Sequence, residues 1–94
     1  MLFMVIERFK NQDPLPVYER LQASGRMMPV GLTYLDSWIE PGFGRVFQMM
    51  ETDDLTTFQR WITRWHDLME FEVVPVVQSR ETIAVLSSFN SGDQ

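Results

Sequence analysis

Blocks of apolar residues alternate with polar turns along the chain and predict a succession of strands and helices. Residues 1–9 are mostly apolar, include β-branched side chains and end in polar residues, which is typical of a strand. Asp13 followed by Pro14 supplies an N-cap oxygen and a proline at the first helical position. Gly25 is a natural helix stop. A helix is therefore expected over residues 14–24.

A hairpin is expected next. Residues 31–40 are rich in aromatic side chains and residues 45–52 are largely apolar, so each segment predicts a strand. The dipeptide Pro41–Gly42 between them has the signature of a type II turn, in which glycine takes the position with positive φ.

A second helix is expected over residues 54–69, with Asp53 or Asp54 as its N-cap. Residues 70–79 are rich in valine and predict a fourth strand, in which Pro75 lacks an N–H and so favours an edge or a bulge. The apolar positions of the helix recur at spacings of 3 and 4 and form one face, made of Leu55, Phe58, Ile62, Trp65 and Met69.

The predicted order is β-α-β-β-α-β followed by a tail. This order is the ferredoxin-like plan, an α+β fold with an antiparallel sheet and two helices on one face. The chain should form one domain over residues 1–94, with residues 79–94 as a C-terminal extension. We expect a short helix from Ser79 as N-cap and frayed residues at 90–94.

Composition narrows the function classes. The net charge is −5, and the eight lysines and arginines are scattered, so the basic stripe of a nucleic-acid binder is absent and an anionic membrane surface is disfavoured. The chain has no cysteine, which excludes disulfides and thiolate metal sites. The apolar residues 1–6 lack a basic region and are too few to span a bilayer. These features predict a soluble cytoplasmic protein.

The strand pattern predicts two apolar faces on the sheet. If Ile39 pairs with Arg45 across the turn, one face should lie under the helices and consist of Leu35, Ile39, Phe47 and Met49. The other face should carry Tyr34, Asp36, Trp38, Val46, Gln48 and Met50, which is too apolar for water. Two helices cover only one face, so we expect a homodimer that packs its sheets together.

Four segments, "MLFMVIERF", "DSWIE", "FQMMETDD" and "EFEVVPVV", resemble a small bacterial family of uncharacterised function within the dimeric α/β-barrel superfamily. The resemblance runs from residue 1 to about residue 77. The superfamily contains cofactor-free oxygenases of phenols and quinones, haem-binding enzymes, lactone isomerases and members without known chemistry. Fold likeness alone does not fix which of these applies.

The histidine of the chain, His66, is a candidate general base or haem ligand at the border of the second helix's apolar face. It is also an ordinary helix-end residue by position, since a histidine there interacts well with the helix dipole. Haem-degrading members of the superfamily pair such a histidine with an asparagine on the first strand, and residues 1–9 contain none. Haem is therefore disfavoured and no cofactor is expected. Trp65 should belong to the core, and Trp61 should lie at its edge.

The second candidate site lies on the hairpin. Asp36 and Gln48 are expected opposite each other on a covered face, where they either hydrogen-bond within the dimer or bind a ligand. A desolvated Asp36 could act as a base. The expected ligand-binding set is Tyr34, Trp38, Gln48, Met50 and His66, with His66 and Asp36 as catalytic candidates. No metal site is expected, because the acidic run at residues 51–54 suits a helix start.

Two functions follow from these patterns. The first is binding of a small apolar or aromatic molecule between sheet and helices, with cofactor-free oxygenation or isomerisation as the chemistry. The alternative is a non-catalytic dimeric module whose polar groups set the interface. The sequence leaves open whether the protein is an enzyme.

Overall fold

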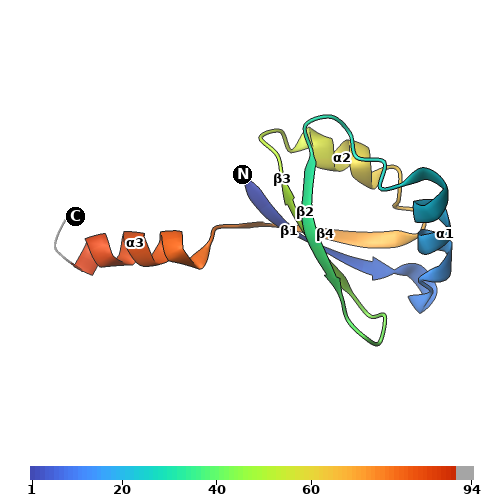
Figure 1. Cartoon of the computed structure of the whole chain (residues 1–94), viewed down its shortest axis with the longest axis horizontal. Coiled ribbons are helices and arrows are strands. Elements are labelled where there is room, and N and C mark those ends of the chain that lie inside the picture. Colours follow the sequence, from blue (N-terminus) through green and yellow to red (C-terminus); the bar gives the residue numbers. More distant parts are fainter. Residues whose placement is uncertain (91–94) are drawn as a thin grey trace.

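A computed structural model describes residues 1–90 of the chain and has the predicted order of elements (Figure 1). The α+β class is confirmed, with one four-stranded sheet and three α-helices in the described part. The strands are β1 (Leu2–Phe9), β2 (Thr33–Ile39), β3 (Val46–Glu51) and β4 (Met69–Val76). The helices are α1 (Leu15–Ser24), α2 (Thr56–Ile62) and α3 (Ser79–Asn90), with a 3-10 turn η1 (Lys10–Gln12). Residues 91–94, where fraying is expected, lie outside the described residues.

The sheet is antiparallel throughout and has the strand order β2-β3-β1-β4. β1 is central, since it pairs with β3 on one side and with β4 on the other. Pro75 lies in β4, an edge strand, as its missing N–H predicts.

Helices α1 and α2 pack on one face of the sheet and enclose the core. The buried residues of β1 alternate, with Phe3, Val5, Glu7 and Phe9 pointing toward the helices. The other buried apolar side chains of the core are Val17, Leu32, Met50, Phe58, Trp61, Trp65 and Met69. The opposite face, which we call the open face, has neither α1 nor α2 on it.

The predicted assignment of strand faces is wrong for β3 and for half of β2. Gln48 and Met50 are buried on the helix side, whereas Phe47 and Met49 lie on the open face. The expected pairing of Ile39 with Arg45 is displaced by one residue, because Ile39 pairs with Val46. A register shift of one residue exchanges the two faces of a strand, and here it moves every side chain of β3 to the face opposite the predicted one.

A bulge at Leu35 changes the faces again within β2. Tyr34 pairs with Met50, but the next pair is Asp36 with Met49, so one residue of β2 is extra. Tyr34 therefore faces the helices and Asp36 faces the open side. The expected juxtaposition of Asp36 with Gln48 is wrong, because the β2 residue that pairs with Gln48 is Ser37.

Helix α1 begins and ends close to its prediction. The Asp13 carboxylate accepts a hydrogen bond from the Leu15 N–H at 3.1 Å, so Asp13 supports the first turn one residue later than expected. Gly25 ends the helix at φ 67°, a conformation that glycine adopts without steric cost.

The hairpin turn differs from its prediction. Gly42 does not have positive φ, and Phe43 takes the left-handed conformation at φ 62°. The Phe43 N–H donates to the Glu40 carbonyl at 2.9 Å, so a β-turn forms, but it is not the predicted type II turn.

Helix α2 is shorter than predicted. Regular helix ends at Ile62, and residues 63–68 form hydrogen-bonded turns instead. Asp54 supports its start by accepting a hydrogen bond from the Thr56 N–H at 2.9 Å. Trp65 is buried as predicted. Trp61 is also fully buried and contacts Phe71 edge-on at 5.2 Å, so its expected place at the edge of the core is wrong.

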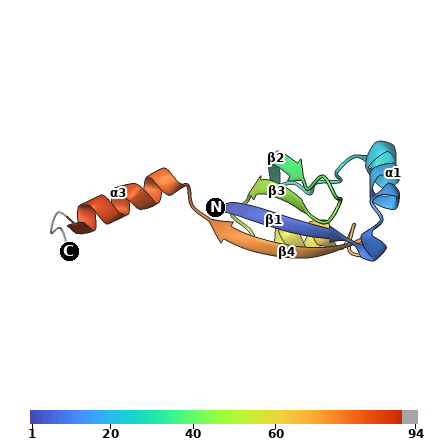
Figure 2. The same ribbon diagram turned by 90° about the horizontal axis from the view of Figure 1, so that it is seen from below.

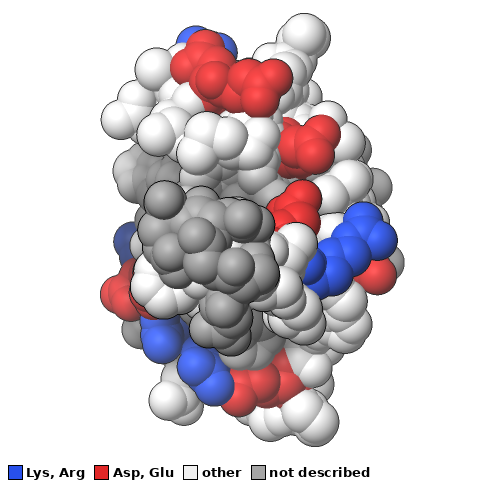
Figure 3. All heavy atoms as spheres, turned by 90° about the vertical axis from the view of Figure 1, so that its left-hand side faces the viewer, with Lys and Arg blue, Asp and Glu red and all other residues white. Residues whose placement is uncertain are grey.

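Helix α3 projects from the end of β4, beyond the opposite end of the sheet from α1 (Figures 1 and 2). Its apolar side chains are largely exposed, including Ile83 and Leu86. Seen from the α3 end, acidic and basic side chains are interspersed with uncharged surface (Figure 3). Among residues 1–90, no helix has the length and apolar character needed to cross a membrane.

Candidate functional site

A glutamate occupies the helix-facing side of the central strand. The period of two along β1 continues from Phe3 and Val5 to Glu7, which is only 1% exposed. A carboxyl group so buried needs a partner or must give up its charge. Glu7 is therefore the most unusual side chain of the core.

Gln48 of β3 is the hydrogen-bond partner of Glu7. Its amide nitrogen Nε2 donates to Oε1 of Glu7, across the pairing of β1 with β3. Gln48 is 7% exposed, and its amide oxygen Oε1 has no hydrogen-bond partner among the described residues. A buried carbonyl oxygen of this kind is a free acceptor, which nearly all buried side chains avoid.

Burial raises the pKa of Glu7 from its ordinary value of 4.5 to about 8, and the positive charge of Arg26 opposes this rise only in part. At neutral pH the side chain is thus a carboxylic acid with one O–H donor. The site therefore presents an uncharged donor, the O–H of Glu7, beside an uncharged acceptor, Oε1 of Gln48.

Arg26 reaches the site from the loop that follows α1. The indole N–H groups of Trp61 and Trp65 both donate to its backbone carbonyl, at 3.0 and 3.1 Å, and fix the loop against α2. Its guanidinium lies over the ring of Tyr34, 3.8 Å from the ring centre, in a cation–π contact. Within residues 1–90, the guanidinium has no carboxylate in an ion pair and no hydrogen-bond acceptor.

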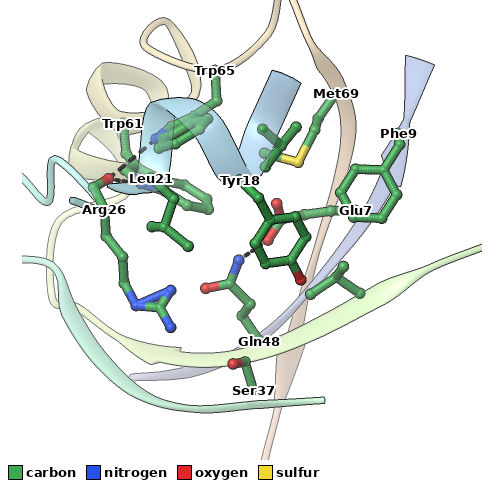
Figure 4. A pocket seen from close by; sticks show the side chains of 12 residues that line it. Glu7, Phe9, Tyr18, Leu21, Arg26, Ser37, Gln48, Trp61, Trp65 and Met69 are labelled. Carbon is green, nitrogen blue, oxygen red and sulfur yellow. Dashed lines mark hydrogen bonds between the residues drawn. The ribbon is translucent and has the colours of Figure 1, made fainter. Parts of the chain in front are cut away.

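These groups surround a cavity of about 90 Å³ between the sheet and the two helices (Figure 4). Figure 4 shows the amide nitrogen of Gln48 toward Glu7 and its amide oxygen on the side of the Arg26 guanidinium. The cavity is partly open to solvent. Its lining consists of Glu7, Phe9, Val17, Tyr18, Leu21, Arg26, Ser37, Val46, Gln48, Trp61, Trp65 and Met69.

Two of the sequence-predicted ligand-binding residues reach the cavity or its rim. Gln48 lines it. Tyr34 lies beside it, with its hydroxyl 2.6 Å from Oγ of the lining residue Ser37. Met50 is buried in the core but does not line the cavity.

The remaining three candidates lie elsewhere. Trp38 is 51% exposed and Asp36 is exposed, both on the open face. His66, a member of the expected ligand-binding set, is exposed after the end of α2 and does not line the cavity. No group of three or more metal-binding side chains occurs among residues 1–90.

Sequence reasoning missed Glu7 and Arg26. The signal for Glu7 was present, because the alternation that puts Phe3 and Val5 on one face puts Glu7 on the same face. Arg26 carries no such signal, since it lies in a loop whose path is set by two tryptophans distant in sequence.

Comparison with protein families found a match over nearly the whole chain. Residues 1–90 match the family described as Domain of unknown function (DUF3303), which confirms the expectation of an uncharacterised family. Comparisons with curated proteins and with solved structures gave no match.

Proposed function

Since the chain belongs to the DUF3303 family, whose description assigns no activity, we propose from the cavity's geometry that the protein binds a small polar molecule there. The observation that carries the proposal is the buried Glu7–Gln48 pair, which offers one donor and one unsatisfied acceptor to a cavity. A mostly apolar cleft with a few convergent polar groups is the usual form of a small-molecule site.

The cavity's volume favours a small ligand. A cavity of about 150 Å³ holds one benzene molecule, and the volume beside Glu7 is about 90 Å³. A ligand of about four to six non-hydrogen atoms is therefore favoured, with its end in the open side of the cavity. The expected phenols or quinones require the cavity to widen.

The chemistry that these residues supply is proton transfer. The protonated Glu7 donates its proton to a carbonyl oxygen of the ligand, and the carboxylate that remains takes a proton from the carbon next to that carbonyl, which gives the enol. The exchange is an isomerase-type tautomerisation that conserves atoms and electrons and needs no cofactor. A carboxyl group whose pKa lies near the working pH suits both steps, and burial raises the pKa of Glu7 to about 8.

Calorimetric titration with small carbonyl and hydroxyl compounds tests the binding proposal. Gln48→Leu removes the acceptor and the partner of Glu7, and Gln59→Leu on the exposed side of α2 is the matched control. We expect binding to the wild type and to the control but not to Gln48→Leu. Equal binding by all three proteins, or binding by none of them, would contradict the proposal.

A second proposal concerns the open face. We propose that two copies pack these faces together, which would give the ferredoxin-like dimeric barrel that the sequence resemblance implies. The face carries half-buried apolar side chains from three strands, namely Leu2, Met4, Ile6, Phe47, Met49, Val74 and Val76. The same patch on each copy suits a twofold interface.

The start of α3 also supports a second copy of the chain as the partner of the open face. A groove of about 620 Å³ lies between the open face and α3, and its lining includes the apolar Leu2, Leu35 and Val77 as well as Glu51 and Glu81. Exposed Ile83 and Leu86 lie farther along α3 and would extend the apolar surface toward a second copy. If the cavity binds no ligand, this dimer is the alternative function, a non-catalytic module. Light scattering that gives the monomer mass at micromolar concentration would contradict the dimer.

A further inference from the structure

The Arg26 guanidinium is a positive charge beside the cavity without a counter-charge. Arg20, Arg45 and Arg60 each have a carboxylate within 4.0 Å, whereas Arg26 forms no ion pair among residues 1–90. Within the same residues Arg8, Arg64 and Arg80 also form none, but of these four arginines it is Arg26 that lines the cavity. The one carboxyl group in the cavity lining, Glu7, is held as a neutral acid by burial. The site therefore has a net positive character although the chain as a whole is acidic.

Contacts from three aromatic side chains fix the position of Arg26. Two indole N–H groups hold its backbone carbonyl, and the ring of Tyr34 supports its guanidinium at 3.8 Å. A guanidinium held in this way loses little conformational freedom when it binds a planar anion. Paired N–H donors of arginine match the two oxygens of a carboxylate.

Gln48 requires a second polar group on the ligand, one that donates a hydrogen bond. Its Oε1 atom is buried, has no partner among residues 1–90 and lies on the side of Arg26 in Figure 4. This atom can only accept a hydrogen bond. The carboxylic acid of Glu7 offers its O–H to an acceptor on the ligand, since the amide nitrogen of Gln48 donates to Oε1 of Glu7 and leaves the acid proton on the other oxygen.

We propose that the cavity binds a short 2-hydroxycarboxylate, with its carboxylate on Arg26 and its hydroxyl between Gln48 and Glu7. The hydroxyl donates to Oε1 of Gln48 and accepts from the carboxylic acid of Glu7, so one group satisfies both. A 2-oxo acid or a plain carboxylate leaves Oε1 of Gln48 unpaired. A 2-hydroxycarboxylate has no ketone for Glu7 to protonate, so it binds as a ligand and is not turned over by the proton transfer proposed above. Sites built to hydrogen-bond a hydroxyl reject analogues that lack it. This inference rests on the proposed small-molecule site and names its ligand class.

Glycolate and lactate are the probes, and calorimetric titration of the full chain is the measurement. Acetate and propionate lack the hydroxyl, and glycolamide and lactamide lack the charge. We expect glycolate to bind at least about tenfold more tightly than acetate and than glycolamide, because each control loses a charge-assisted or buried hydrogen bond.

Arg26→Met tests the carboxylate contact, and Arg60→Met is the matched control on the exposed face of α2. We expect glycolate affinity to fall at least about tenfold in Arg26→Met and to change less than about twofold in Arg60→Met. Circular dichroism establishes that both variants fold. If Arg26→Met does not fold, the comparison of glycolate with glycolamide on the wild type alone tests whether the ligand's carboxylate charge contributes to binding.

The outcomes separate this inference from the proposed function. Glycolamide binding as tightly as glycolate, or unchanged glycolate affinity in Arg26→Met, overturns the ligand class while the cavity remains a binding site. Acetate binding as tightly as glycolate overturns the role of the hydroxyl. No binding by any charged or neutral probe overturns both proposals.

Discussion

Replacing Glu7 with glutamine should stabilise the protein, and the gain should depend on pH. Glutamine keeps the shape of the neutral carboxylic acid, and its amide does not titrate. In the wild type, burial holds the pKa of Glu7 at about 8 in the folded state, against an ordinary value of 4.5. The unfolded chain therefore releases this proton near pH 4.5, and the folded chain keeps it until about pH 8.

The sign follows from proton binding. Between pH 4.5 and about 8, folding takes up one proton at Glu7, so raising the pH destabilises the folded wild type. Below pH 4.5 both states carry the proton, and above about pH 8 neither does, so the pH dependence stops at both limits. The interval is roughly 3.5 pH units, and each unit corresponds to about 1.4 kcal/mol. The full effect is thus on the order of 5 kcal/mol, comparable to the whole stability of many small domains.

Urea denaturation of both proteins from pH 4 to pH 9 measures this effect. The difference in unfolding free energy, Glu7→Gln minus wild type, should be constant below pH 4.5, rise through neutral pH and level off above about pH 8. Other carboxyl groups, such as Asp67 with its pKa lowered by Arg20, titrate in both proteins and cancel. Parallel curves for the two proteins across this range would refute the assignment of Glu7 as a buried acid.

Four further changes test the backbone, the packing and the proposed interface. Gly25→Ala should cost about 1–3 kcal/mol by thermal or urea unfolding, because φ at Gly25 is 67°. Gly42→Ala should be nearly neutral, since φ there is not left-handed and an added Cβ meets no atom within 4 Å. Thr57→Val should cost about 1–3 kcal/mol by the same measurement, because the buried hydroxyl donates to the Asp54 carbonyl at 2.7 Å, and an unchanged urea midpoint would disprove this role. Ile6→Glu on the open face should convert the proposed dimer to a monomer with unchanged circular dichroism, and an unchanged mass by light scattering would disprove that interface.

Local patterns predicted the order of the elements well, because each signal acts over a few residues. The start of α1 near Asp13, its end at Gly25 and the valine-rich β4 follow from capping and strand propensities. The length of α2 was overestimated. Its apolar spacing continues past Ile62, but the chain turns there so that Trp65 reaches the Arg26 carbonyl, a tertiary contact that no local pattern encodes.

The faces of the sheet could not be predicted from the hairpin alone. Register depends on the turn geometry, and here the left-handed residue is Phe43 rather than Gly42. The resulting shift of one residue and the bulge at Leu35 exchanged the faces of β3 and divided those of β2. The period of two in residues 1–9 places Phe3, Val5 and Glu7 on one face, so this pattern carried the signal for the buried acid.

The central claim is that Glu7 is a protonated acid in a ligand-binding cavity, and carbon-13 NMR of its carboxyl group tests this most directly. The spectrum of Glu7→Gln identifies the signal by its absence. A titration of the wild type should give a midpoint at about pH 8, and the signal should move when glycolate is added at pH 7. A midpoint near 4.5 with no response to glycolate would contradict the account.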